Sequence, residues 1–150
     1  MSYKLYSNLK QTRLNEIVII NTGAFYTTYN KDAELLHELL DYKIISFKNY
    51  QKIGFPSIKL MDILRILQIK NINCYVYENS QVFRIYAYPI NNYHKYLNKS
   101  VDIQVAKREL LMQIHQLLRT KSYKDISIVA RSLNIKTDVK VFNVDEEENA

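Results

Sequence analysis

Phe25 has the clearest potential for contact chemistry in this chain, because it stands just beyond the end of an apolar run. The run Ile17–Ile20 contains only aliphatic residues, which predicts a strand buried on both faces. Gly23, one of two glycines, follows where a tight bend needs conformational freedom. The ring of Phe25 either packs into the core or stacks on a partner. Much of the functional interpretation depends on which of the two is correct.

Side chains that could carry catalysis or bind a metal are scattered along the chain. The histidines and the single cysteine lack the spacing of a metal site: His37, Cys74, His94 and His115. Asp32, Asp41 and Glu78 fall at the expected ends of helices and strands, where capping and solvation explain them. The sequence has no glycine-rich phosphate loop with Gly-Lys-Ser or Gly-Lys-Thr. We therefore predict no enzymatic activity, no metal site and no cofactor; a small nuclease, the alternative, would need a carboxylate cluster.

Aromatic residues alternate through two β-rich segments and could form a base-stacking platform: Tyr75, Tyr77, Phe83, Tyr86 and Tyr88. The segments lack the glycine-aromatic signature of RNA-binding sheets. We interpret these rings as ordinary residues of a pleated face and its edge.

The elements that must position Phe25 follow from the periodicity of the sequence. Tyr3–Lys10 predicts a short helix or a turn, and Glu16–Thr22 predicts the buried strand. Asn30 is predicted to cap a helix over Lys31–Leu40, whose apolar stripe and acidic first turn suit that structure. A second strand is expected over Lys43–Phe47, beside the first.

The next stretch is expected to leave regular structure before returning to it. Asn49–Lys52 has the composition of a linker, and Gly54-Phe55-Pro56 that of a fixed, non-regular turn. Ser57 is predicted to cap a helix with one apolar face: Leu60, Ile63, Leu64 and Leu67. Asn73–Glu78 and Val82–Tyr88 predict an antiparallel hairpin.

The C-terminal part is predicted to be mainly helical, with a long helix over Val101–Thr120. Its apolar stripe is expected to cover the sheet or a neighbouring helix: Ile103, Leu110, Ile114 and Leu117. A shorter helix is predicted over Lys124–Asn134, and a last strand over Thr137–Val144 before an acidic tail. Basic residues surround the long helix, and Lys107 and Arg108 are candidates for phosphate contacts; a partner-docking face and a solvated basic face are the alternatives.

Composition and charge bound the class of protein. With 150 residues, 47% hydrophobic and 24% charged, the chain has a globular profile and the size of one domain. The net charge of +6 includes −4 from residues 145–148, so the rest carries +10, which favours phosphate backbones or acidic partners. The apolar runs are too short to cross a bilayer, and the N-terminus lacks a signal-peptide core. With a single cysteine, this predicts a cytoplasmic protein without a membrane partner.

Six short motifs occur in a fixed order: Tyr6–Lys10, Glu16–Thr22, Gly23-Ala24-Phe25-Tyr26-Thr27, Asp32-Ala33, Gly54-Phe55-Pro56 and Val76-Tyr77-Glu78. Their order and spacing resemble the N-terminal mismatch-recognition domain of MutS DNA repair proteins. That domain has a Tyr-Leu-Lys lead-in, an apolar strand, Gly-Asp-Phe-Tyr-Glu, a helix opening with Asp-Ala, then Gly-x-Pro, and a strand ending in Cys-Glu-Gln. The resemblance covers about Tyr3–Ile90 and includes none of the clamp, lever and ATPase parts of a full MutS.

The resemblance implies an α/β fold with a mixed β-sheet flanked by helices over residues 3–90. A helical extension over 91–144 is expected to pack on it, followed by an acidic tail over 145–150. In the family, the signature phenylalanine enters the DNA minor groove and stacks on a mispaired base, and a glutamate two residues later hydrogen-bonds that base. Phe25 matches the phenylalanine, whereas Thr27 replaces the glutamate and Ala24 the aspartate. A threonine hydroxyl gives a weaker bond and no charge, so loose binding is expected.

The resemblance and the basic charge predict a non-enzymatic nucleic-acid-binding module. Its expected contact residues are Gly23, Phe25, Tyr26, Thr27, Phe55, Lys107 and Arg108. The expected ligand is a distorted or mismatched duplex, either DNA or an RNA/DNA hybrid. Stand-alone domains of this family occur beside reverse transcriptases in diversity-generating retroelements, so a reverse transcriptase is an expected partner. The alternative is a protein-interaction module that kept the fold and lost DNA binding.

Overall fold

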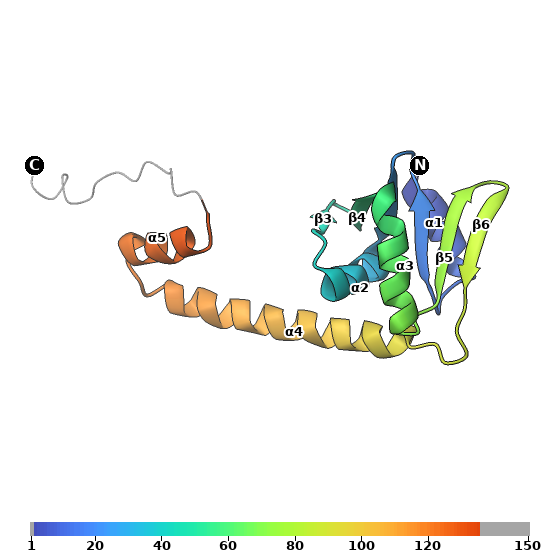
Figure 1. Ribbon diagram of the computed structural model, residues 1–150. Helices are drawn as coiled ribbons and strands as arrows, with labels where there is room; N and C mark the ends of the chain where they lie inside the picture. Colours follow the sequence, from blue (N-terminus) through green and yellow to red (C-terminus); the bar gives the residue numbers. More distant parts are fainter. Residues whose placement is uncertain (1, 136–150) are drawn as a thin grey trace, which may run out of the picture. The chain divides into compact units, whose positions relative to one another are not determined.

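The computed structural model describes residues 2–135, and its contacts divide the chain into two units, residues 1–105 and 106–150 (Figure 1). The elements are α1 (Ser2–Gln11), β1 (Ile17–Asn21), β2 (Phe25–Tyr29), α2 (Asn30–Leu40), β3 (Ile45–Ser46), β4 (Gln51–Pro56), the 3-10 turn η1 (Ser57–Lys59), α3 (Leu60–Ile69), β5 (Cys74–Asn79), β6 (Val82–Tyr86), α4 (Tyr93–Leu118) and α5 (Tyr123–Ser132). The first unit therefore includes the first half of α4. The strand expected over 137–144 and the acidic tail lie outside the described residues.

The six strands of the described chain form one mixed sheet in the order β3-β4-β2-β1-β5-β6. β1 is parallel to β5, and each other neighbouring pair is antiparallel. The core on one face is built with α2 and α3, and the core on the other face with α1 (Figure 1). The predicted mixed sheet flanked by helices, with further helices after it, is confirmed.

β1 is buried on both faces, as its apolar run predicts. Ile17 and Ile19 belong to a cluster formed with α2, α3 and the start of α4. Val18 and Ile20 belong to a second cluster under α1. Burying side chains of this size contributes roughly 1.5–3 kcal/mol each, so β1 contributes apolar stabilisation on both sides of the sheet.

The fully buried carboxylate of Asp32 holds four elements of the first unit together. Tyr6 and Lys10 of α1 donate to it from a hydroxyl and an ammonium group, at 2.7 Å and 3.0 Å. The Tyr93 hydroxyl of α4 donates at 2.6 Å, and the backbone N–H of Val18 in β1 at 3.1 Å. A buried carboxylate is tolerated only with such partners. The expectation that Asp32 caps a helix or is solvated is wrong.

β1 and β2 pair only near the turn that joins them. Further from the turn, side chains bind backbone groups of β1 that β2 would otherwise bind. The N–H of Val18 donates to Asp32, and its C=O accepts from Thr28 Oγ1 at 2.8 Å. No loop separates β2 from α2, because α2 begins at Asn30, directly after the last residue of β2. The φ of Asn30 is +49°, in the left-handed region that asparagine tolerates. Asn30 is not the predicted N-cap, because the N-cap position of α2 is Tyr29. The Asn30 side chain instead donates to the Tyr3 hydroxyl and accepts the Gln51 N–H.

Two segments of the outer sheet differ from the predictions. The residues expected as a linker and a turn form strand β4, because Ile53 and Phe55 alternate into the core. Pro56 ends this strand, where a missing N–H is tolerated. The strand expected over Lys43–Phe47 beside β1 is reduced to Ile45–Ser46 and pairs with β4, because β2 and β5 already occupy both sides of β1.

The predicted helices of the first unit and the hairpin are confirmed, with small shifts at their ends. The apolar face of α3 is buried as expected: Leu60, Ile63, Leu64 and Leu67. Ser57 begins η1 without a side-chain cap bond, so its predicted capping role is wrong. β5 and β6 form the expected antiparallel hairpin.

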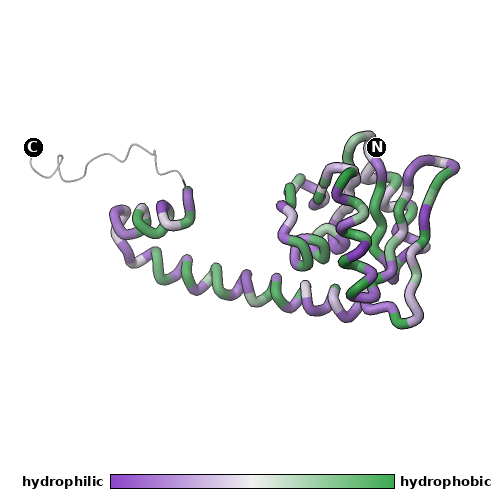
Figure 2. Tube along the Cα trace, in the orientation of Figure 1, coloured by the Kyte–Doolittle hydropathy of each residue, from purple (hydrophilic) through white to green (hydrophobic). Residues whose placement is uncertain are grey.

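α4 begins at Tyr93, well before the predicted start at Val101. Tyr93, Leu97 and Ser100 recur at helical spacing and are buried in the first unit. The Asn91 side chain accepts the Tyr93 N–H at 3.1 Å and fixes this start. In Figure 2 hydrophobic and hydrophilic residues alternate along α4. In the second unit the stripe expected to be covered is exposed, at Leu110, Ile114 and Leu117. The shorter predicted helix is confirmed as α5.

Replacing Asp32 by asparagine is expected to lower the free energy of unfolding by about 3–5 kcal/mol, because the Lys10 ammonium and two buried hydroxyls lose their charged acceptor. Urea unfolding followed by circular dichroism measures this loss. Asp62→Asn, at an exposed site on α3, is the matched control and is expected to change stability by no more than about 0.5 kcal/mol. Equal losses in the two variants would contradict the structural role of Asp32.

Stability is also expected to fall at alkaline pH. Burial, and then the charge of Asp32, raise the pKa of Tyr6 and Tyr93 well above the ordinary value of 10.0. The folded chain keeps both protons where the unfolded chain releases them. The stabilisation is therefore complete below about pH 10 and is lost above it, by up to about 1.4 kcal/mol per pH unit for each tyrosine. Urea unfolding at about pH 8 and about pH 11 measures the loss, and the Tyr6→Phe/Tyr93→Phe double variant should show a smaller one.

Candidate nucleic-acid interface

The two-residue turn Gly23-Ala24 connects β1 to β2 and puts Phe25 at the rim of the sheet. The N–H of Thr22 donates to the C=O of Phe25 at 2.8 Å. Gly23 has a φ of +91°, so the predicted need for a glycine is confirmed. The N–H of Ser57 donates to the C=O of Ala24 at 2.9 Å, which fastens the turn to the start of η1.

Strand alternation in β2 separates the exposed ring from the core. Phe25 is 51% exposed, and Thr27 lies on the same face of the strand. Tyr26 points the other way into the core, where its ring stacks on Phe55 with centroids 5.9 Å apart. Its hydroxyl donates to the Glu78 carboxylate at 2.8 Å, and burial raises its pKa. The expected contact role of Tyr26 and Phe55 is corrected: both support the strand that carries Phe25.

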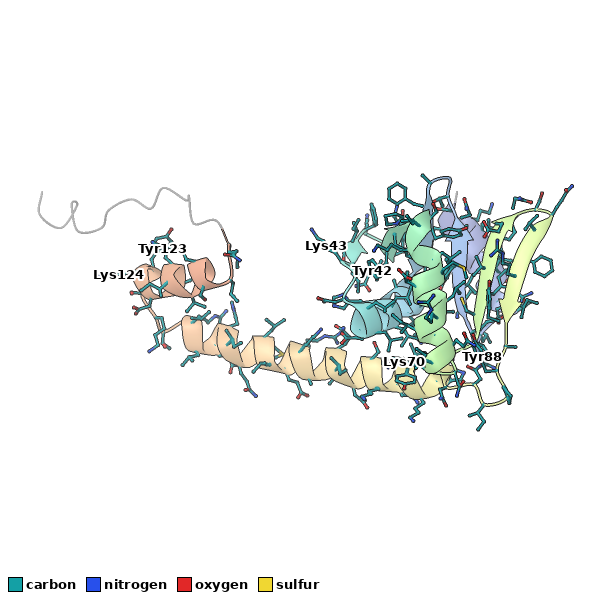
Figure 3. All side chains as sticks on the ribbon, viewed as in Figure 1. Tyr42, Lys43, Lys70, Tyr88, Tyr123 and Lys124 are labelled. Carbon is teal, nitrogen blue, oxygen red and sulfur yellow. The ribbon has the colours of Figure 1, made fainter. Side chains whose placement is uncertain are left out.

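A groove of about 520 Å³ lies beside Phe25. Its lining comes from the hairpin turn, β2, β4 and the segment before β3: Thr22, Phe25, Thr27, Tyr42, Lys43, Ile45, Lys52, Gly54 and Pro56. Phe25 and Thr27 stand opposite Pro56 and Gly54 in the β2–β4 pair, so these four positions share a face. Tyr42 and Lys43 lie on the segment that leads from α2 to β3 (Figure 3).

The charge and polarity of the groove suit a ligand that carries phosphate. Lys43 and Lys52 both line it, whereas its lining includes no carboxylate. Lys59 lies in η1, close to the turn that Ser57 binds. The Oγ1 atom of Thr27 is buried and has no hydrogen-bond partner among the described residues. The groove therefore combines two lysines with a lining that contains no carboxylate.

Two exposed aliphatic side chains belong to segments that meet the hairpin turn or line the groove. Ile58, which is 82% exposed, follows the residue that is bonded to the hairpin turn. Ile45, on the β3 side of the groove, is half exposed. Proteins that bend DNA insert apolar side chains of this kind between base steps. An aromatic ring with aliphatic neighbours and nearby lysines can therefore contact both bases and phosphates.

Other candidates from the sequence are not among the residues that line the groove. Lys107 and Arg108 are in the second unit, on α4, and their phosphate role stays a prediction. Tyr75 is buried, with the Arg13 guanidinium 3.6 Å from its ring centroid, and Phe83 stacks on it at 5.5 Å. For this pair, the interpretation of the aromatic group as sheet packing is confirmed.

Metal-binding and redox-active side chains are not gathered in the described chain. Cys74 is buried, and burial raises the pKa of its thiol well above the ordinary value. Residues 2–135 contain no group of three or more histidine, cysteine, aspartate or glutamate side chains placed to hold a metal ion. None of the helices in the same range is long and apolar enough to span a membrane.

Most residues of the groove were not among the contact residues expected from the sequence: Thr22, Tyr42, Lys43, Ile45, Lys52, Gly54 and Pro56. The alternation Lys52-x-Gly54-x-Pro56 is a signal that places three lining positions on one face, provided the segment is recognised as a strand. No comparable signal points to Lys43, because its segment reaches the groove through tertiary packing.

A mixed sheet whose first hairpin presents an exposed phenylalanine beside a lysine-lined groove is the structure of a MutS-like DNA-binding domain. The family model of MutS domain I matches residues 2–114 of this chain. The match covers most of the sequence, so the protein belongs to the MutS domain I family, and the resemblance carried by the short motifs is confirmed. It extends past Ile90 into α4, and so includes Tyr93, a donor to Asp32. No curated protein matches the chain.

Alanine substitutions are expected to separate the exposed ring from the buried one. Phe25→Ala should change the free energy of unfolding by less than about 1 kcal/mol, because half of the ring is already in solvent. Phe55→Ala should cost about 3–5 kcal/mol, because it leaves a cavity in the core. Urea unfolding compares the two variants. Similar losses would identify Phe25 as a core residue and remove it from the site.

Proposed function

We propose that this protein is a non-enzymatic module that binds distorted duplex nucleic acid through Phe25. The observation that carries the proposal is an exposed ring at the end of the hairpin, beside a groove lined by Lys43 and Lys52. Such a ring replaces base stacking that is lost at a mismatch or nick, where the duplex is already easy to kink. The lysines contact phosphates and supply affinity that does not depend on sequence.

Thr27 sets the expected specificity. A carboxylate at this position would offer a strong, charge-assisted hydrogen bond to a displaced base, whereas the hydroxyl offers a weaker bond and no charge. The absence of an anion also removes a repulsion between the site and the phosphates. We therefore expect similar affinity for mismatched, nicked and hybrid duplexes, without selection of one mismatch.

The resemblance to stand-alone members of the family supports a cellular setting. Such domains accompany reverse transcriptases in diversity-generating retroelements, where mismatched duplexes and RNA/DNA hybrids arise. In this proposal the protein is an accessory that holds the distorted template–product duplex for the polymerase. The basic character of the chain outside residues 145–148 suits a role on nucleic acid.

A protein-interaction module without nucleic-acid binding is the second candidate function. Exposed apolar side chains in the second unit favour it: Leu110, Leu111, Met112, Leu117 and Ile128. Exposed apolar patches on soluble proteins commonly mark sites of contact with another protein. The two candidates differ in whether Phe25 contacts nucleic acid.

Titration with matched, mismatched, nicked and RNA/DNA-hybrid duplexes at two salt concentrations tests the proposed function. Phe25→Ala is expected to weaken binding of distorted duplexes by about tenfold or more and to leave the matched duplex unaffected, because stacking on an aromatic ring contributes about 1–3 kcal/mol. Phe83→Ala removes a ring of similar exposure, 53%, on β6 and is expected to have no effect. The Lys43→Gln/Lys52→Gln double variant should weaken all duplexes and flatten the salt dependence.

Each unexpected result has a separate meaning. No binding of any duplex at low salt would exclude the nucleic-acid function and favour the protein-interaction module. Binding that is indifferent to Phe25→Ala would retain the electrostatic contact and exclude the stacking ring. Metal-dependent cleavage of the duplexes would contradict the non-enzymatic proposal.

A further inference from the structure

We infer that two copies of this chain associate through the second unit, with the last part of α4 and α5 of one copy packed against the same helices of the other. The centre of the contact is the α4 stripe, which consists of Leu110, Ile114 and Leu117. These three residues recur at helical spacing and are all exposed. The dimer goes beyond the proposed function, because it forms without nucleic acid and does not use Phe25.

The described part of the second unit has almost no core of its own. Among residues 106–135, Ser127 alone is buried, and Leu118, Ile126 and Ala130 are partly buried. Large apolar side chains of this range are exposed instead: Leu110, Leu111, Met112, Ile114, Leu117, Ile128, Val129, Leu133 and Ile135. α5 has ten residues, and helices shorter than about 12–15 residues are marginal without tertiary packing. These helices therefore need a partner surface for stability.

The exposed apolar area is large enough for a stable dimer. Each of these side chains leaves about 100 Å² in solvent, so together they present on the order of 1,000 Å². A stable interface between two proteins takes about 800 Å² from each partner. Two helical pairs that cover each other's apolar residues form a four-helix bundle, whose core consists of residues of this kind.

The distribution of charge favours a second copy over an acidic protein or a nucleic acid. The run Leu110–Leu118 contains no lysine, arginine, aspartate or glutamate, whereas Lys107 and Arg108 precede it and Arg119 follows it. Two copies that meet along this run keep like charges out of the centre of the contact, and the centres of protein interfaces are depleted of charge in this way. An anionic partner would contact the flanking basic residues instead. Closed twofold pairs are also the commonest oligomers of soluble proteins.

Sedimentation equilibrium of the full-length chain, free of nucleic acid, tests the inference at about 1–100 µM. The wild type is expected to have twice the mass of one chain, which is 17.8 kDa. Ile114→Lys should raise the Kd of the dimer about 100-fold or more, because symmetry places the new charge in the contact twice. Gln116→Lys adds the same charge on the opposite side of α4 and should remain dimeric. Phe25→Ala should also remain dimeric.

Ile114→Ala keeps a high helix propensity and removes most of the apolar side chain, so it should weaken the dimer by about tenfold or more. This variant tests the inference if Ile114→Lys fails to fold, which far-UV circular dichroism reveals.

A wild type that is monomeric at about 100 µM would overturn the inference and leave the α4 stripe to a different protein. A dimer of unchanged affinity in folded Ile114→Lys or in Ile114→Ala would place the contact elsewhere and also overturn it. Dissociation of the dimer as the salt concentration rises would show a contact that depends on charge, which contradicts an apolar stripe. None of these results affects the proposed function, because that function depends on how Phe25→Ala binds distorted duplexes.

Discussion

The buried carboxylate of Asp32 is the interaction on which the rest of the first unit depends. It receives hydrogen bonds from α1, β1 and α4, so one side chain at the start of α2 fixes three other elements. It also accepts the Val18 N–H at a position where β1 no longer pairs with β2. The short pairing between β1 and β2 is confined to the end where Phe25 lies.

At that end of the hairpin, adjacent residues of β2 point to opposite faces of the sheet. Tyr26 and Phe55 stack in the core, and the Tyr26 hydroxyl is held by Glu78, so the backbone of β2 is fixed from below. Phe25 and Thr27 consequently point away from that core. A ring that is half exposed on a well-packed strand is pre-organised for contact, since little conformational freedom of the backbone remains to be lost on binding.

The groove beside Phe25 contains features that are not part of the family motif. Lys43 and Lys52 provide positive charge, and Gly54 adds no side chain to the lining. These features suit a ligand with a flat ring and a phosphate. The second unit has a different character, with exposed apolar residues on α4 and α5.

The sequence by itself determined most of the helices, the β5–β6 hairpin, the buried strand β1, the glycine turn and the family, because periodicity and short motifs are local properties of the chain. It misjudged β4, since the residues Gly54-Phe55-Pro56 have the composition of a turn and become a strand only by pairing with β2. It also described Asp32 as a surface acid, because its four donors come from distant segments. Only the tertiary structure decided that Tyr26 and Phe55 are buried, that Lys43 reaches the site, and that a groove lies beside Phe25. Each of these depends on which segments pack together, and that is set by the pairing of strands and the burial of polar groups between residues far apart in the chain.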